Sequence, residues 1–233
     1  MSVIEHHLPD DTALARALAD DVARRLRDAI DVRGRALLCV SGGRSPVPFF
    51  EALHEHALDW ARVTVTLVDE RCVPRAHPDS NAGLVHRHLL TGPAAAATWI
   101  ELVDEAGGDA DAQAARAAAR VRPLWPADVV VLGMGADGHT ASIFPRVDGF
   151  EALTGADNDA LYAAVTPLDA PHQRITLTLR ALRQARHRAL QLSGADKLAV
   201  YAQARTGPDP GHPISLVLAG APTEVWIADG AKI

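Results

Sequence analysis

Short apolar runs alternate with amphipathic stretches along almost the whole chain. The runs that predict buried strands lie at 36–40, 63–68, 99–103, 128–132, 161–165, 174–178, 188–192 and 224–228. Apolar side chains at helical spacing predict helices over 11–31, 47–58, 79–90, 109–121, 177–184 and 193–204. This alternation of strands and helices predicts a three-layer α/β/α sandwich with a mostly parallel, doubly wound sheet. No repeat or linker interrupts the pattern, so we expect residues 1–233 to form a single domain.

Composition narrows the classes of function. The chain has 233 residues, of which 48% are apolar and 22% charged, and its formal net charge is −6. An acidic chain without a basic block argues against nucleic acid or an anionic membrane as its main partner. Two cysteines form no disulfide framework, which favours a reducing cytoplasm. The amino-terminal residues lack the pattern of a signal peptide, and no apolar run reaches membrane-spanning length.

The stretch DVVVLGMGADGHTASIFP at 128–145 carries the strongest chemical signal. It predicts a central strand that ends in a glycine-rich turn, at the sheet edge where ligands of open α/β folds bind. Asp137 and His139 lie two residues apart, and a carboxylate beside an imidazole can hold that ring as a base near neutral pH. We also expect His139 to open a helix that continues through Thr140 and Ser142. The alternative is that DGH is ordinary turn chemistry.

A second glycine turn, SGGRSP at 41–46, follows another predicted strand. Ser45 is expected to cap the next helix and Pro46 to occupy its first turn, so free backbone N–H groups would face an anion. The turn matches neither the phosphate-binding G-K-[ST] signature nor the dinucleotide fingerprint. It can also be read as a plain flexible connection.

Charged residues at the ends of other predicted elements point toward the same edge. Asp69 and Arg71 follow the strand 63–68 and could face one cleft, although an internal pair between Glu70 and Arg71 would also explain the run. Arg174 opens the strand 174–178. Lys197 falls in the first turn of a helix, where the helix dipole disfavours a cation unless an anion is bound. Lys197 and Lys232 are the two lysines of a chain that otherwise uses arginine.

The sequence does not favour a metal site or a cysteine nucleophile. The pairs His54/His56 and His86/His88 are two residues apart on expected helices and therefore do not share a face, so we predict no metal site there. Cys72 has no histidine in motif context beside it and is not expected to be a nucleophile.

Taken together, the motifs SGGRSP, LVDERCVP with the later SN, GMGADGHTASIFP, RITLT, SGADK and VWIAD resemble the 6-phosphogluconolactonase family over the whole chain. The resemblance implies hydrolysis of 6-phospho-D-glucono-1,5-lactone to 6-phosphogluconate in the oxidative pentose phosphate pathway. It implies no metal and no organic cofactor, a phosphorylated sugar lactone as the small-molecule partner, and a monomer or weak homodimer.

The resemblance also implies roles for the residues that match its motifs. His139, oriented by Asp137, would be the base that activates water, and Arg71 would face the substrate with Asp69 nearby. The residues that would hold the phosphate are Gly42, Gly43, Ser45, Arg174 and Lys197. Arg44 departs from the family pattern, in which Ser or Thr is frequent, and adds positive charge to the loop.

Two alternatives share the architecture. Amino-sugar phosphate deaminases resemble the pattern DGHIAFNEP, whereas this chain reads DGHTASIFP, with Phe144 at the position of the Glu and Arg71 in place of an aromatic residue. Both differences favour the lactonase. The second alternative, a non-catalytic sugar-phosphate sensor, would need a DNA-binding domain and a basic patch, for which the chain has no room.

Overall fold

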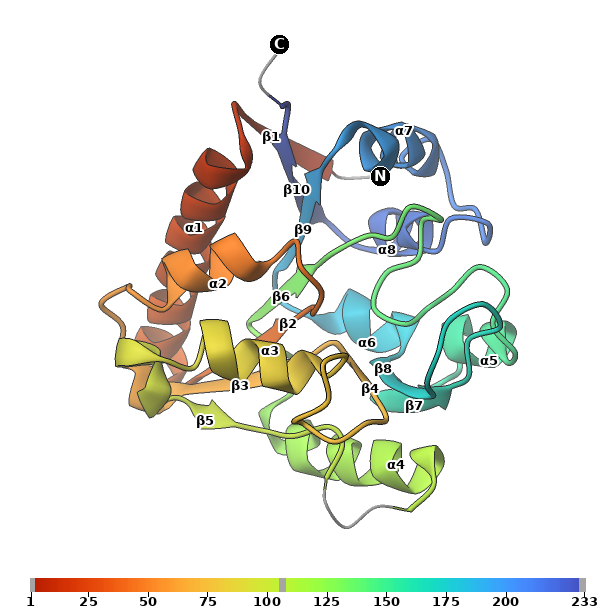
Figure 1. Cartoon of the computed structure of the whole chain (residues 1–233), viewed down its shortest axis with the longest axis horizontal. Coiled ribbons are helices and arrows are strands. Elements are labelled where there is room, and N and C mark those ends of the chain that lie inside the picture. Colours follow the sequence, from red (N-terminus) through yellow and green to blue (C-terminus); the bar gives the residue numbers. More distant parts are fainter. Residues whose placement is uncertain (1–2, 105–107, 231–233) are drawn as a thin grey trace.

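A parallel sheet of seven strands runs through the molecule in the order β1-β10-β9-β6-β2-β3-β5 (Figure 1). The computed structural model describes residues 3–104 and 108–230, so Lys232 lies outside the described residues. The strands are β1 (Val3–Leu8), β2 (Ala36–Val40), β3 (Val63–Leu67), β5 (Thr98–Trp99), β6 (Val129–Leu132), β9 (Arg188–Ser193) and β10 (Thr223–Ala228). Strands β2 and β6 are buried at every position, as expected for a sheet covered on both faces.

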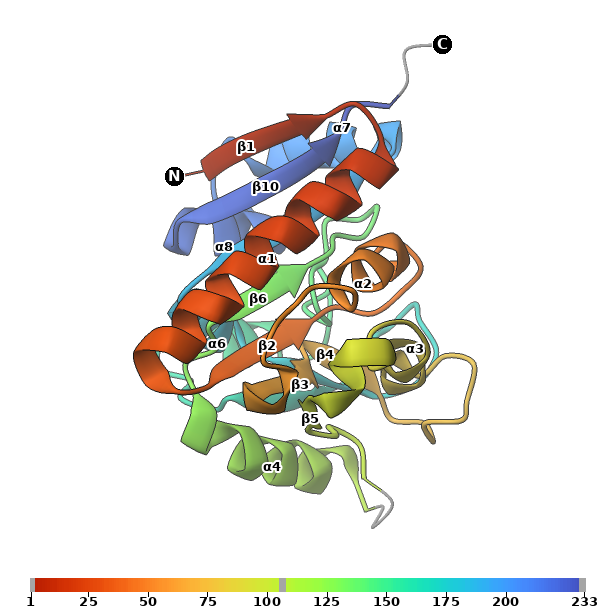
Figure 2. The ribbon, with the colours of Figure 1, turned by 90° about the vertical axis from the view of Figure 1, so that its left-hand side faces the viewer.

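Helices cover both faces of this sheet, which confirms the predicted three-layer α/β/α sandwich. Figure 1 shows α1 and α2 on one side and α6, α7 and α8 on the other, and Figure 2 shows α1 crossing the face of the sheet. The helices are α1 (Asp11–Arg33), α2 (Val47–Leu53), α3 (Asn81–His88), α4 (Ala110–Val121), α5 (Phe150–Thr154), α6 (Leu179–Gln184), α7 (Ala195–Ala204) and α8 (Ile214–Gly220). Short 3-10 turns lie at Trp60–Arg62, Gly92–Ala96 and Arg122–Leu124. No helix among the described residues is long and apolar enough to cross a bilayer.

A second, antiparallel sheet of three strands was not predicted. It consists of β4 (Asp69–Arg71), β8 (Arg174–Leu177) and β7 (Tyr162–Val165), in the order β4-β8-β7, and α4 packs against it. The backbone N–H of Val68 still donates to Val40 in the parallel sheet (3.0 Å), whereas its carbonyl accepts from Leu177 in the other sheet (2.8 Å). The chain therefore passes from one sheet to the other at residue 68.

Several local expectations were wrong or incomplete. The edge strand β1 was missed because the polar run Glu5–His7 interrupts its apolar residues, VIEHHL. The short apolar run after Pro213 forms helix α8. Helix α2 ends at Leu53 rather than at 58, and its N-cap is Pro46, with no side-chain hydrogen bond from Ser45.

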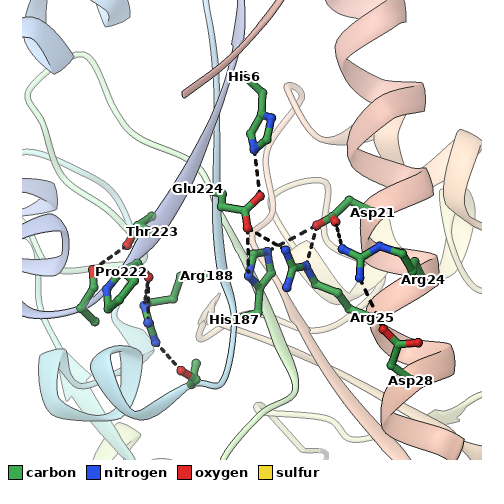
Figure 3. Close-up of polar contacts among 12 residues, drawn as sticks. His6, Asp21, Arg24, Arg25, Asp28, His187, Arg188, Pro222, Thr223 and Glu224 are labelled. Atoms are coloured by element: carbon green, nitrogen blue, oxygen red, sulfur yellow. Dashed lines mark hydrogen bonds and ion pairs between the residues drawn. The ribbon is translucent and has the colours of Figure 1, made fainter. Parts of the chain in front are cut away.

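An ionic cluster fastens α1 to the amino ends of β9 and β10 (Figure 3). Arg25 donates from Nε to Asp21 Oδ2 (2.7 Å) and from Nη2 to Glu224 Oε1 (2.6 Å). The ring of His187 lies between the same two carboxylates, at 3.6 Å from Asp21 and 3.9 Å from Glu224, which is too far for hydrogen bonds. Burial, followed by the charge of Arg25, lowers the pKa of His187 to about 4. The ring is therefore neutral in the folded protein at neutral pH.

This cluster predicts a loss of stability in mild acid. The unfolded ring takes up a proton below its ordinary pKa of 6.5, whereas the folded ring does so only near 4. The free energy of unfolding should therefore fall as the pH drops from 6.5 toward 4, by up to roughly 3 kcal/mol. Urea unfolding at a series of pH values measures this slope. His187→Phe should flatten it, and His88→Phe, at a partly exposed site on α3 beside Glu51, should leave most of the slope in place. A wild-type curve that is flat over this range would contradict the assignment.

Candidate functional site

The carboxyl edge of the parallel sheet opens onto a cavity of about 320 Å³. Of the residues singled out from the sequence, all except Asp137 line it: Gly42, Gly43, Ser45, Asp69, Arg71, His139, Arg174 and Lys197. They come from the loops after β2 and β6, from the first turn of α7, and from β4 and β8 of the second sheet. Asp137 stands behind His139 rather than in the cavity wall.

Asp137 and His139 form a close pair. Asp137 Oδ1 lies 2.6 Å from His139 Nδ1 and also accepts from the backbone N–H of residue 139 (3.1 Å). Burial of the carboxyl opposes its charged form, but the hydrogen bonds and charge of His139 outweigh burial, so the pKa of Asp137 is lowered. An ionised carboxylate can only accept, which puts the proton of the neutral ring on Nδ1. The lone pair of Nε2 is then free to take up a proton.

The glycine turn leaves no room for a side chain at Gly135. A Cβ there would lie 2.2 Å from His139 Nδ1 and 2.6 Å from Asp137 Oδ1. The backbone N–H of Gly135 donates to the carbonyl of His139 (2.9 Å), which closes the turn around the pair. The absence of a Cβ is therefore a condition for the histidine–carboxylate contact.

The helix expected to open at His139 does not exist. Thr140 donates from its hydroxyl to the carbonyl of Gly133 (2.8 Å), and Ser142 donates from its hydroxyl to Asp69 Oδ2 (2.6 Å). Ala141 has a φ of +50°, outside the right-handed helical region. The two hydroxyls instead tie the turn to the ends of β6 and β4.

Arg71 and Arg174 face each other directly across the antiparallel pair β4–β8. Arg174 is 8% exposed, and the Nε atoms of both arginines are buried without a hydrogen-bond partner among the described residues. Burial, followed by repulsion from Arg71, lowers the pKa of Arg174, although Asp69 opposes this. Like charges opposite each other on a sheet are destabilising unless an anion lies between them.

Glu70 is buried and forms hydrogen bonds at the start of helix α3, a role that the sequence did not suggest. It is 1% exposed and accepts from the backbone N–H groups of Arg71, Asn81 and Ala82 and from the Ser80 hydroxyl, at 2.6 to 3.0 Å. Glu70 thus caps helix α3, and it makes no side-chain pair with Arg71. Burial raises its pKa against the effect of these bonds.

Lys197 lies in the first turn of α7, as predicted, and its Nζ is 3.4 Å from Ser45 Oγ. The side chain expected to cap α2 therefore faces a cation instead. Cavity-lining residues outside the predicted set include Asn81, Met134 and Gln191. Asn81 entered the sequence analysis only through the SN motif, without a role of its own, and its Nδ2 donates to the carbonyl of Asp69 (2.9 Å). Gln191 lies inside an apolar strand, where nothing local marked it.

A family model described as glucosamine-6-phosphate isomerases/6-phosphogluconolactonase matches residues 9–226. This chain belongs to that family. The matched range contains every residue of the cavity described above. The family combines two kinds of enzyme, glucosamine-6-phosphate isomerases and 6-phosphogluconolactonases.

Relatives named 6-phosphogluconolactonase cover most of the chain. One from Pseudomonas putida is 49% identical over 205 residues, which are 88% of this chain and 84% of that protein. One from Neisseria meningitidis serogroup B is 44% identical over 214 residues, or 91% of this chain and 93% of that protein. The crystal structure of a 6-phosphogluconolactonase from Shewanella baltica OS155 superimposes with a TM-score of 0.92 at 39% identity, covering 97% of each chain.

The lack of space at Gly135 predicts the effect of a substitution in the glycine turn after β6. Gly135→Ala should push the His139 ring away and break its contact with Asp137, because the added methyl group would overlap Nδ1. Gly133→Ala is the matched control, since a Cβ at Gly133 has no neighbour within 4 Å. Nitrogen chemical shifts of the His139 ring, measured by NMR, should lose the signature of a hydrogen-bonded Nδ1–H in the first variant and keep it in the second. Identical spectra would refute the steric argument.

Proposed function

We propose that this protein hydrolyses 6-phospho-D-glucono-1,5-lactone to 6-phospho-D-gluconate in the oxidative branch of the pentose phosphate pathway. The observation that carries the proposal is the Asp137–His139 pair at a cavity whose other walls bear arginine and lysine. A base beside a cationic cavity suits an electrophilic ester that carries a phosphate. The family membership and the similarity to named 6-phosphogluconolactonases support the same conclusion.

In this mechanism, His139 Nε2 takes a proton from the water that attacks C1 of the lactone. The proton on Nδ1 stays directed at Asp137, whose carboxylate stabilises the imidazolium that forms. When the ring C–O bond breaks, the same imidazolium returns a proton to the leaving oxygen. General acid–base help of this kind contributes typically ~10²–10⁴-fold to the rate.

Arg71 is our candidate for stabilising the oxyanion at C1. The backbone N–H groups of Gly133 and Gly135 are already engaged, with Ser41 Oγ at 3.2 Å and the carbonyl of His139 at 2.9 Å. Arg71 lines the cavity and has an unpartnered Nε. We assign Asp69 a positioning role, because its carboxylate accepts from Ser142 and lies near the charge of Arg174.

The phosphate would be held by the two glycines at 42–43, by Ser45 and Lys197, and by Arg174. Bringing a dianion to these groups relieves the repulsion around Arg174 and gives Lys197 an anionic partner at its helix terminus. Binding the remote phosphate also fixes C1 against His139, so that attack by water becomes effectively intramolecular.

Phe144 favours the lactonase over the deaminase. Its ring packs on His139 with 4.5 Å between centroids, and the guanidinium of Arg174 lies 5.6 Å from the Phe144 centroid. An apolar ring thus occupies the place at which the deaminase pattern has a carboxylate partner for the histidine.

We further propose that the protein works as a single domain in the cytoplasm, as a monomer or weak homodimer, without metal or organic cofactor. Its free Cys39 and Cys72 suit a reducing compartment.

His139→Ala should abolish catalysis, because no other base would accept the proton of water. The lactone is generated in situ and its loss is followed against spontaneous hydrolysis, with wild type and variant side by side. The variant should fall by about 10²-fold or more toward the background. His7→Ala, on the far edge strand, is the control and should keep wild-type activity. If wild type merely matches the background, the lactonase proposal fails, and release of ammonia from an amino-sugar phosphate would favour the deaminase.

Lys197→Ala should mainly raise KM for the lactone, by roughly tenfold, because a charge-assisted hydrogen bond to phosphate is lost in the ground state and the transition state alike. The kcat should change little. Lys197→Arg keeps the charge and should recover part of the affinity. Steady-state kinetics of the three proteins give both constants, and a KM that stays at the wild-type value in Lys197→Ala would remove this lysine from the phosphate site.

A further inference from the structure

Gln191 is a buried amide at the edge of the cavity. It is 6% exposed, and its Nε2 has no hydrogen-bond partner among residues 3–104 and 108–230. Leu190 pairs with Leu132, the last residue of β6, so Gln191 stands beside the start of the glycine turn. Strand β9 has the sequence RALQLS, so Gln191 lies between Leu190 and Leu192 before the final Ser193. A polar side chain therefore occupies a position that packing alone would give to leucine.

Gln191 also belongs to the wall between two cavities. A second cavity of about 280 Å³ adjoins the first and shares with it Arg44, Ser45, Gln191 and Lys197. The second cavity is not lined by His139, Arg71 or Arg174. Gln191 thus groups with the lysine–serine end of the site, away from the proposed base.

A buried amide without a hydrogen bond lowers the stability of the protein by about 1–3 kcal/mol. We therefore expect such a group in a cavity wall to bind a ligand that satisfies it. A half turn about the last side-chain bond of Gln191 would exchange its NH₂ group and its oxygen, so the donor can take either of the two positions. The amide is neutral, so it can donate to an anion without adding to the repulsion among Arg44, Lys197 and the other cations. Phosphate oxygens accept several hydrogen bonds and suit this position best among the groups of a phosphorylated sugar.

We propose that Gln191 is a further phosphate-binding residue, which donates from its side-chain amide to the substrate phosphate beside Lys197. The proposal rests on the proposed lactonase function and adds a specificity determinant to it. Gln191 touches the non-reacting end of the substrate, so it should affect binding of phosphorylated lactones and leave the chemistry at C1 unchanged.

The test compares two substrates. Gln191→Met keeps the size of the side chain and removes the donor. For 6-phospho-D-glucono-1,5-lactone we expect KM to rise about tenfold with kcat nearly unchanged, the effect of losing one hydrogen bond to a charged group. For glucono-1,5-lactone, which lacks the phosphate, kcat/KM should stay at the wild-type value. Gln191→Glu should raise KM for the phosphorylated lactone further, because a carboxylate repels phosphate.

Gln113→Met is the matched control. Gln113 is also 6% exposed, and its Oε1 has no hydrogen-bond partner among the described residues, but it lies on α4 and lines a different cavity. It should match Gln191→Met in any general loss of stability and leave KM unchanged. An equal loss on both lactones, or no loss on either, in Gln191→Met would overturn the proposal.

Calorimetric titration with inorganic phosphate separates this proposal from the proposed function. Wild type should bind phosphate about tenfold more tightly than Gln191→Met, whether or not the lactone is a substrate. If wild type does not accelerate lactone hydrolysis, the proposed function is refuted, but the titration still tests the role of Gln191. Equal phosphate affinities in the two proteins would refute the proposal that Gln191 binds phosphate.

Discussion

The parallel pairing of β2, β6 and β9 is the constraint on which the site depends. Adjacent parallel strands end at the same edge of a sheet, and the chain must leave each of them through a loop at that edge. The loops after residues 40, 132 and 193 therefore converge, although long stretches of sequence separate them. Ser41 Oγ accepts from the backbone N–H of Gly133 at 3.2 Å, so two of these loops are joined directly. Glycines in the same loops let the backbone come close to the cavity without filling it.

Positive charge is concentrated at this edge of the sheet. The whole chain carries a net charge of −6, yet Arg71, Arg174 and Lys197 gather around one cavity. Asp69 and Glu70 offset part of this positive charge at Arg174, although the Glu70 carboxylate is hydrogen-bonded to the amino terminus of α3. The result is a cationic site that is held in place by buried acidic and backbone groups, and whose internal repulsion an anionic ligand relieves.

The family combines isomerases and lactonases on one fold, so the fold locates the chemistry without choosing it. In the mechanism we propose, the choice lies in the surroundings of His139. Asp137 holds one ring nitrogen, and Phe144 covers a face of the ring with apolar surface. A histidine in this setting has a single free nitrogen, which suits one proton transfer to and from an ester better than a shuttle between two carbons.

Local patterns in the sequence determined the order of most strands and helices. All but one of the predicted site residues line the cavity, because glycine turns and charges at strand ends are local features. Pairing between distant segments leaves no such pattern. The sequence therefore did not reveal the second sheet that sets Arg71 opposite Arg174, the capping of α3 by Glu70, or the turn that replaced a helix after His139. Gln191 was hidden for the same reason, since hydrophobic periodicity records which side chains are buried and only the tertiary structure decides what they meet.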